Sequence, residues 1–460
     1  MRREFETMVI GAGQAGLSVS YYLKAARRDH VVIERAEQAA ESWRNHRWDS
    51  FTLNTPNWQS QLAGGEIRGA DPDGFLGRDE VVACFEKYER QNHLPVRYGV
   101  QVWAVTPTSS GAGYIVKTNA GAFWAKNVVV ATGLYQKPRT PDFAKSLSPQ
   151  IQQVHSDCYR NPSLLAPGAV LVVGSGQSGA QIAEELYQSG RKVYLSVSGA
   201  GRVPRRYRGK DINWWHDQLG LYEKTVNQLA SPRAKFSSKP HISGNAGGHT
   251  LNLHQFASDG VTLLGRILGV EGAVLKIAGD LHENLAKADQ FEAELIEKID
   301  RHIERNALIF PQDELPKLTS GFGQPEIRQL DLRQAEINSV VWAPAIPSTS
   351  AWCKSSHSTA MDIQFSDAVS QTIQVSTSLG SRGCTRPNRV CCSACPKMPP
   401  TSLRISFREK IVKHRTLPLQ ENSSRWAVNS ERITFINRCR NSRATLDHKG
   451  TSPCVGRQRF

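Results

Sequence analysis

Three glycines near the start of the chain have the spacing of a phosphate-binding turn. Gly11, Gly13 and Gly16 form the pattern G-x-G-x-x-G directly after the apolar run MVI at 8–10. In such a turn the first glycine permits a sharp bend, the second lets the backbone approach a pyrophosphate, and the third lets a helix pack closely on a strand. The helix that follows directs its positive N-terminal end at the phosphates. The pattern therefore predicts a dinucleotide site.

The residues around these glycines complete a strand–helix–strand unit over 7–35. Apolar residues follow a helical spacing after Gly16, and a second apolar run, VVI at 31–33, ends in Glu34. An acidic residue at that position accepts hydrogen bonds from a ribose. The unit therefore suits FAD, and we expect five residues to bind it: Gly11, Gly13, Gln14, Gly16 and Glu34.

A second copy of the unit lies at 168–198. Its second strand, VYL at 193–195, ends in Ser196 instead of an acid, and arginines follow it. Arginine suits a 2′-phosphate, which it can bind through two parallel hydrogen bonds. The alternative is that the arginines belong to a solvated loop. The second site therefore favours NADP(H), bound by Gly174, Gly176, Gln177, Ser178, Gly179, Arg202 and Arg205.

Two dinucleotide sites in one chain imply that a hydride passes from NADPH to FAD. Alternating strands and helices predict the α/β class, with two Rossmann-like domains and a largely disordered C-terminal tail. We expect the first part of the FAD-binding domain at 1–150, the NADP-binding domain at 151–320, a return to the FAD domain at 321–343, and the tail at 344–460.

Apolar patterns elsewhere predict the elements around these units. Residues 73–96 and 280–305 have helical spacing, with the second helix on the NADP side as a lid or surface helix. Short strands with glycine-rich turns predict a β-meander over 96–133. Residues 326–343 predict a helix that leads into a final buried strand.

Four segments resemble the class B flavin-dependent monooxygenases. These are ESWRNHRWDSFTLNTPNW (41–58), VVVATGLYQKPRTP (128–141), QQVHSDCYRNP (152–162) and RVPRRYRGKDINWW (202–215). The last is most similar to a bacterial branch of putative flavoproteins. The chain departs from the family pattern at Pro149 and Ile151, where an aromatic residue and a glycine are usual. The resemblance covers about residues 5–343.

The resemblance implies a function and several site residues. NADPH would reduce FAD, oxygen would form a peroxyflavin, and one oxygen atom would pass to a small organic substrate. Asn54 would bond near the peroxide, although a turn before Pro56 explains it equally well. Trp43 would pack on the flavin or fill core, and His155 would orient NADP or cap a turn. The resemblance also places three residues beside FAD: Ala131, Thr132 and Gly133.

Two other flavoprotein activities are alternatives. Disulfide reductases share the double fold but need a redox cysteine pair, whereas Cys84 and Cys158 stand apart and no C-x-x-C precedes residue 344. An NADPH oxidase that releases peroxide remains open. We expect a small-molecule substrate and oxygen as partners, and no nucleic acid, metal or membrane span.

Composition changes abruptly at residue 344. The formal net charge is +15, and residues 344–460 hold 18 Lys/Arg and 6 Asp/Glu, so they account for +12 of it. They also hold 7 of the 9 cysteines. The part before 344 is nearly balanced and poor in cysteine, and the chain starts without a signal-peptide pattern, which predicts a cytoplasmic enzyme.

The change at 344 has the pattern of a lost nucleotide. The strand VVW at 340–342 leads into Ala343 and then PAI, where the family has Ala-Thr-Gly-Tyr. One base restored before the Pro344 codon permits Thr-Gly-Tyr. The same regrouping of 375–395 permits GLYFLGLPWLHT, a buried strand and turn of the family. We therefore predict that 344–460 is translated out of frame, that the CSAC motif at 392–395 is accidental, and that an inactive remnant is a third hypothesis.

Overall fold

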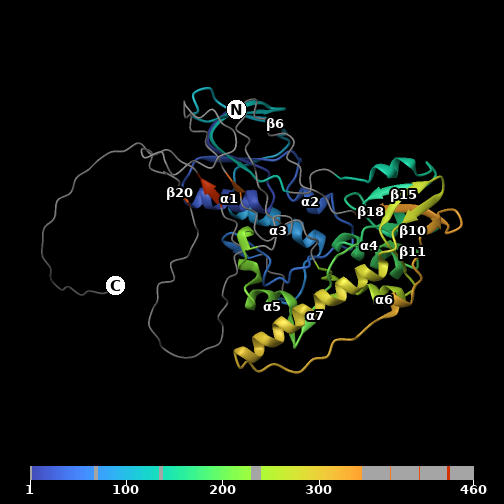
Figure 1. The fold of residues 1–460 in the computed structure, drawn as a ribbon. Helices are drawn as coiled ribbons and strands as arrows, with labels where there is room; N and C mark the ends of the chain where they lie inside the picture. Colours follow the sequence, from blue (N-terminus) through green and yellow to red (C-terminus); the bar gives the residue numbers. More distant parts are fainter. Residues whose placement is uncertain are drawn as a thin grey trace, which may run out of the picture.

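Two α/β lobes, each built around its own sheet, make up the described part of the chain (Figure 1). This computed structural model describes residues 3–66, 71–133, 138–228 and 240–343, and three short strands after residue 343. The predicted α/β class with two Rossmann-like units is confirmed.

The first lobe contains a six-stranded sheet. Its strands, in order across the sheet, are β5 (Val96–Arg97), β2 (His30–Ile33), β1 (Glu4–Ile10), β8 (Gly121–Val130), β7 (Tyr114–Thr118) and β6 (Val102–Pro107). The first four are parallel, and β6, β7 and β8 form the predicted antiparallel meander. The helices α1 (Gln14–Ala25) and α3 (Arg78–Gln91) share one apolar core against this sheet, so the predicted helix within 73–96 is confirmed.

The two ends of the long strand β8 have different neighbours. Residues 121–125 pair antiparallel with β7, and residues 124–130 pair parallel with β1. Val129 is fully buried, and Val128 and Val130 are each 7% exposed. No described strand pairs with 127–130 on the side opposite β1. Among the strands that the structure describes, β8 therefore has a partner on each side only at 124–125.

The second lobe contains a five-stranded, fully parallel sheet. Its order is β14 (Thr262–Leu264), β11 (Val193–Ser196), β10 (Ala169–Val173), β18 (Ile337–Trp342) and β9 (Gln152–His155). All five residues of β10 are buried, which is typical of a strand covered on both faces. The helices α4 (Gln177–Gln188) and α6 (Leu253–Ser258) contribute to its core.

The segment 326–343 differs from its prediction. It contains no helix: β17 (Gln329–Asp331) forms a three-stranded antiparallel sheet with β15 (Ile267–Glu271) and β16 (Val274–Ile277). A turn then leads to β18, which lies inside the second sheet between β10 and β9. The expected return to the FAD domain over 321–343 is therefore wrong for β18. Any return of the chain to the first lobe comes after this strand.

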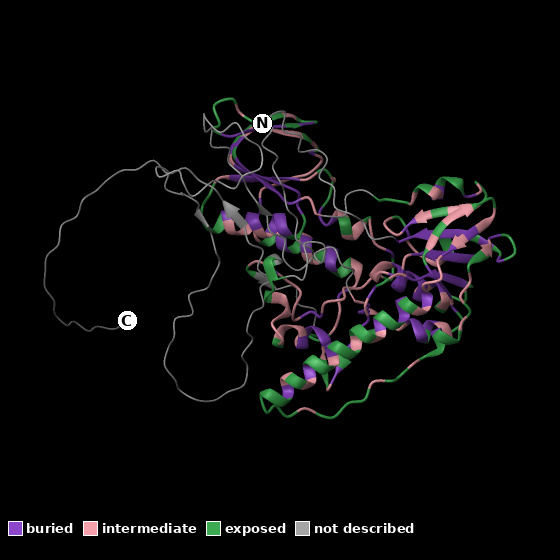
Figure 2. Cartoon of the chain, viewed as in Figure 1, coloured by how far each residue is buried: buried purple, intermediate pink, exposed green. Residues whose placement is uncertain are grey.

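The predicted helix at 280–305 is confirmed as α7 (Leu281–Arg305), which lies along the second lobe (Figure 1). One face is buried and the other is exposed (Figure 2). Leu285, Leu295 and Ile299 lie on the buried face, whereas Phe291 is 45% exposed. Smaller elements complete the list: α2 (Glu41–Arg44), β3 (Gln61–Leu62), β4 (Gly65–Glu66), β12 (Arg206–Tyr207), β13 (Lys210–Asp211) and α5 (Ile212–Gln218).

After Ala343 the structure describes β19 (Ile373–Gln374), β20 (Leu403–Arg404) and β21 (Ile433–Phe435), which form one small sheet. The prediction of a disordered, out-of-frame segment at 344–460 otherwise lies outside the described residues. None of the described helices is both long and apolar enough to cross a bilayer.

Candidate dinucleotide-binding site

The first glycine turn leaves no room for side chains at two of its three glycines. Gly11 has φ +105°, and a Cβ there would collide with the carbonyl oxygen of Ala131. A Cβ at Gly16 would collide with the carbonyl oxygen of Gly11, because α1 packs directly on the turn. At Gly13, in contrast, a Cβ would meet nothing within 4 Å. The backbone at Gly13 is therefore open to an incoming group, as a pyrophosphate requires.

The ends of neighbouring strands meet at this turn as predicted. The Ala131 N–H donates to Ile10 O (2.8 Å) and the Gly11 N–H donates to Ile33 O (2.8 Å). Glu34 accepts from the Ala12 N–H at Oε2 (2.8 Å) and from the Ala36 N–H at Oε1 (3.0 Å). The carboxylate thus lies beside the turn. Its bond to a ribose stays a prediction.

The other predicted residues of the first site occupy its periphery. Gln14 begins α1 and is exposed, while Thr132 and Gly133 follow β8 directly, with Gly133 at φ +73°. Trp43 packs against the first core, and its ring lies 5.7 Å from that of Phe51. Trp43 therefore packs against the core, which was one of its two predicted roles. A contact with the flavin stays a prediction.

The second turn repeats the geometry of the first. Gly174 has φ +103°, a Cβ at Gly179 would collide with Gly174 O, and a Cβ at Gly176 would meet nothing within 4 Å. The equivalence extends to a fourth residue. Ala343 N–H donates to Val173 O (2.9 Å), as Ala131 does to Ile10 in the first copy.

Ala343 also occupies the place that Ala131 has beside the third glycine. The Ala131 Cβ lies 3.5 Å from a Cβ built on Gly16, and the Ala343 Cβ lies 3.3 Å from one built on Gly179. In the first copy the chain continues with Thr132 and Gly133, but in the second it continues with Pro344 and Ala345. The sequence thus departs from the repeat immediately after the last equivalent residue.

A segment at 240–243 supports the back of the second turn. Gln177 donates from Nε2 to Ile242 O and accepts from the Ile242 N–H at Oε1 (3.2 Å). His241 bonds through Nε2 to Ser175 O, and burial lowers its pKa to about 4. The side-chain amide of Gln177, which was predicted to bind a cofactor, is therefore already hydrogen-bonded to the backbone of Ile242. Ser178, the next residue of α4, is half-buried.

The predicted role of Arg202 does not fit its position. Arg202 is 7% exposed, and it donates from Nη1 to Asp289 Oδ1 (2.7 Å) and from Nη2 to Glu292 Oε2 (2.6 Å). Two carboxylates of α7 more than neutralise one guanidinium, so the surroundings disfavour a phosphate. Arg202 is neither a 2′-phosphate ligand in this arrangement nor part of a solvated loop. It fixes α7 to the second lobe.

Arg205 is likewise internal. It is 2% exposed and donates from Nε to Asp211 Oδ2 (2.8 Å) and from Nη1 to Asn54 O (2.8 Å). Its guanidinium carbon lies 4.3 Å from the ring centroid of Phe75. The two arginines that were predicted to bind the cofactor therefore serve internal contacts, and Arg205 reaches into the first lobe.

Asn54 lies where the two lobes meet. Its Oδ1 accepts a hydrogen bond from Gln181 Nε2 (3.2 Å), and Gln181 belongs to α4. Gln181 was not predicted, although it follows Gln177 by four residues and so shares its side of the helix. The contact places a candidate catalytic amide of the first lobe on the helix that begins at the second turn.

His155 ends β9 at the carboxyl edge of the second sheet. Its Nδ1 accepts from the Asp157 N–H (3.1 Å), which supports the turn-capping alternative. Burial lowers its pKa, and its buried Nε2 has no hydrogen-bond partner among the described residues. Burial thus favours the neutral ring, and the bond accepted at Nδ1 places its proton on Nε2. The structure describes no hydrogen bond between His155 and Asn54.

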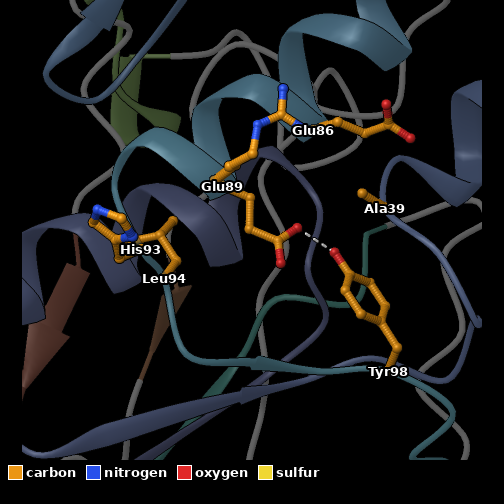
Figure 3. A pocket seen from close by; sticks show the side chains of 7 residues that line it. Ala39, Glu86, Glu89, His93, Leu94 and Tyr98 are labelled. Carbon is orange, nitrogen blue, oxygen red and sulfur yellow. Dashed lines mark hydrogen bonds between the residues drawn. The ribbon is translucent and has the colours of Figure 1, made fainter.

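A pocket of about 540 Å³ lies beside α3, and it is lined in part by Tyr98, which follows Arg97, whose carbonyl oxygen accepts from the Glu34 N–H (2.9 Å) (Figure 3). Its two carboxylates already have partners, since Glu89 accepts from Tyr98 Oη and Glu86 pairs with Arg44. Both carboxylates of this pocket are therefore engaged, and the open glycines place the candidate site at the two turns. In the described part of the chain no cluster of residues suits a metal ion.

Comparison with known proteins relates the chain to oxidoreductases. The sequence profile of the pyridine nucleotide-disulphide oxidoreductases matches residues 8–215. A protein of Geobacillus kaustophilus, called uncharacterized oxidoreductase CzcO-like, is 42% identical over 240 residues, which are 52% of this chain and 67% of the relative. The chain belongs to the family of CzcO-like oxidoreductases.

Other matches place this CzcO-like chain among flavoenzymes. CzcO of Bacillus subtilis is 38% identical over 47% of the chain and 62% of the relative. Indole-3-pyruvate monooxygenase YUCCA1 of Oryza sativa is 28% identical over 44% of the chain and 50% of the relative. The chain thus spans about two thirds or less of the curated relatives it matches.

A solved structure shares the fold. A doubly substituted mutant of a flavin monooxygenase from Stenotrophomonas maltophilia has a TM-score of 0.50 and 19% identity, covering 76% of this chain and 80% of that one. The matching sequence profile is that of enzymes that use a pyridine nucleotide. The two open turns at Gly13 and Gly176 fit such cofactors. The cysteines before 344, Cys84 and Cys158, are not paired with each other.

Proposed function

We propose that this CzcO-like chain derives from, and in its intact frame is, an NADPH-dependent FAD monooxygenase that transfers one oxygen atom to a small organic substrate. The observation that carries this proposal is the duplicated turn, in which Gly13 and Gly176 leave open backbone at equivalent positions of the two lobes. FAD, when bound, supplies the hydride acceptor and the reductant of oxygen. No redox cysteine pair is described beside the first turn, which opposes a disulfide reductase.

The protein groups have distinct tasks in this proposal. The N-termini of α1 and α4 direct backbone N–H groups at the pyrophosphates, and Glu34 accepts from a ribose hydroxyl. Asn54 has its amide oxygen engaged by Gln181, so its Nδ2 group is the donor available for the reacting oxygen. His155 accepts the Asp157 N–H at Nδ1, so a neutral ring carries its proton on Nε2 and would donate from there toward the nicotinamide.

An oxidase or an inactive remnant is the second candidate. The observation that favours it is the break directly after Ala343, at the position equivalent to Ala131. Without the second Thr-Gly turn the chain loses the segment that the family resemblance places at the flavin. Unpaired Cys84 and Cys158 support the further proposal of a reducing, cytoplasmic compartment.

The visible absorption spectrum of the purified chain tests these candidates. A flavin band that bleaches when NADPH is added without oxygen supports a working pair of sites. Admission of oxygen then separates the two activities, because an oxidase releases one peroxide per NADPH and a monooxygenase with its substrate does not. A protein without a flavin band contradicts activity of the 460-residue chain.

A further inference from the structure

Arg205 is the centre of a buried contact that joins the two lobes. From the second lobe it bonds Asp211 and donates to Ser243 O (3.4 Å). Toward the first lobe it donates to Asn54 O (2.8 Å) and stacks on Phe75. The guanidinium thus donates hydrogen bonds to both lobes and also lays its flat face on Phe75. Lysine has neither a fork of donors nor a flat face, so it cannot make these contacts.

The backbones of the two lobes approach closely around this contact. A Cβ at Gly244 would collide with the carbonyl oxygen of Leu53, and a Cβ at Gly248 would press against the ring of Phe75. The side chain of Asn213, in α5, also lies 3.5 Å from Asn54 O. The loop that carries Asn54 is therefore held from the second lobe by backbone and side chains together.

The same loop is linked to the second dinucleotide turn. Asn54 Oδ1 accepts from Gln181, which lies one turn along α4 from Gln177. Arg205 fixes the backbone oxygen of Asn54, and Gln181 fixes its amide oxygen. Two bonds on one short residue determine both where its Cα lies and which way its Nδ2 group points.

We infer that Arg205 is a positioning residue, which holds the Asn54 amide in place across the seam between the two dinucleotide-binding lobes. Its consequence for catalysis rests on the proposed function, whereas its effect on the loop does not. Arg205 itself touches no substrate in this inference. It sets the geometry of a residue that does.

Hydrogen–deuterium exchange of the 460-residue protein, without added cofactor, tests the structural part. The variant is Arg205→Lys, which keeps the positive charge beside Asp211. The matched control is Arg208→Lys, since Arg208 lies in the same segment but pairs with Asp300 on α7. We expect amides of 50–57 to exchange roughly tenfold faster in Arg205→Lys, because a charge-assisted hydrogen bond is lost, and to keep the wild-type rate in Arg208→Lys. Equal rates in all three proteins overturn the inference.

A second variant guards against a general loss of folding. Phe75→Leu removes the stacking surface and leaves every hydrogen bond of Arg205 in place. We expect the same peptide to exchange faster, by a smaller factor, while the peptides of β10 and α4 remain unchanged. Faster exchange over the whole second lobe would instead show that Arg205 supports the fold and not the loop, and would also overturn the inference.

A kinetic measurement tests the catalytic part where the protein contains flavin. Arg205→Lys should lower the kcat of NADPH oxidation roughly tenfold or more, since misplaced groups lose rate steeply, with the KM for NADPH within about twofold of wild type. A raised KM with unchanged kcat contradicts positioning and indicates a cofactor contact. If the protein holds no flavin, the proposed function of this chain fails, and the exchange experiment still decides the role of Arg205.

Discussion

Single glycines of the two turns have different physical tasks. Gly16 and Gly179 are required by the protein itself, because a methyl group there collides with a carbonyl oxygen of the turn. Gly13 and Gly176 are not required by the protein, since their φ values of −78° and −67° suit any residue and the space beside them is open. The proposed dinucleotides account for glycine at these two positions.

Alanine substitutions separate these tasks. Gly13→Ala should leave the thermal unfolding temperature of the flavin-free protein unchanged and reduce its flavin content several-fold, because the methyl group occupies the approach of the pyrophosphate. Gly16→Ala should lower both quantities, with a loss of stability of about 1–3 kcal/mol from overpacking. Scanning calorimetry and the flavin absorbance measure them. A Gly13→Ala protein with normal flavin content would refute the assignment of the first site.

The ion pair between His249 and Glu184 makes the stability of the fold depend on pH. Its Nε2–Oε1 distance is 2.6 Å, and the hydrogen bond to Glu184 raises the pKa of His249. Glu184 lies in α4 and is 5% exposed. A raised pKa in the folded state means that protonation stabilises the fold. This stabilisation is complete below the ordinary histidine pKa of about 6.5 and is lost as pH rises through the raised value.

His249→Gln isolates this contribution from the other histidines, of which His155, His216 and His241 have lowered pKa values through burial. The difference in unfolding temperature between wild type and His249→Gln should be largest near about pH 6 and should shrink toward about pH 9. Thermal unfolding across this range measures it. A difference that stays constant over the range would show that His249 acts by packing alone.

Elements set by local sequence were predictable, and elements set by distant partners were not. Both strand–turn–helix units follow from glycine spacing and apolar runs within about 30 residues, and both are confirmed. At 326–343 the same kind of reasoning was wrong. Leu330 pairs with Leu275 in a sheet whose other strands lie some 55 residues earlier, and no local pattern reports that pairing.

The arginines show the same limit at the candidate site. The carboxylates that neutralise Arg202 lie 87 and 90 residues further along the chain, on α7. Residue type and order after β11 were compatible with a phosphate ligand. Only the packing of α7 on the second lobe reveals that the guanidinium is already occupied.

Arg202→Met tests the corrected role of this helix anchor. The change leaves Glu292 without its guanidinium partner and Asp289 with His254 alone, and breaking a buried ion pair costs about 3–5 kcal/mol. We expect faster amide exchange along α7 and a lower unfolding temperature. The ratio of kcat/KM for NADPH to that for NADH should stay within about twofold of wild type. A selective loss of NADPH use would restore Arg202 as a 2′-phosphate ligand.

At the scale of the whole molecule, the repeat locates the break in the chain. Ala131 and Ala343 make the same backbone bond and the same contact to the third glycine of their turns. The two lobes share one architecture up to these two alanines. If the whole sequence had been selected to fold, we would expect a related continuation after both of them. The match supports the hypothesis that 344–460 is read out of frame.

Restoring one nucleotide before the Pro344 codon gives the direct test. The restored protein should bind flavin at close to one equivalent and unfold at a higher temperature than the 460-residue chain, because a buried strand and helix each contribute several side chains at about 1.5–3 kcal/mol. Expression of both forms side by side, with flavin absorbance as the readout, measures this. Equal flavin content in the two forms would show that the first 343 residues suffice.

The end of β8 at 127–130, which has no described neighbour opposite β1, also restricts what can follow Ala343. A strand added beside 127–130 would lie between the layers that bury Val128 and Val129, so both of its faces would be dry. The segment as it stands, VSTSLG at 375–380, carries hydroxyl groups at Ser376, Thr377 and Ser378. Successive residues of a strand point to opposite faces, so this run would put unpaired hydroxyls on both. This edge of the sheet therefore requires an apolar strand, and the reading frame after Ala343 decides whether the chain can supply one.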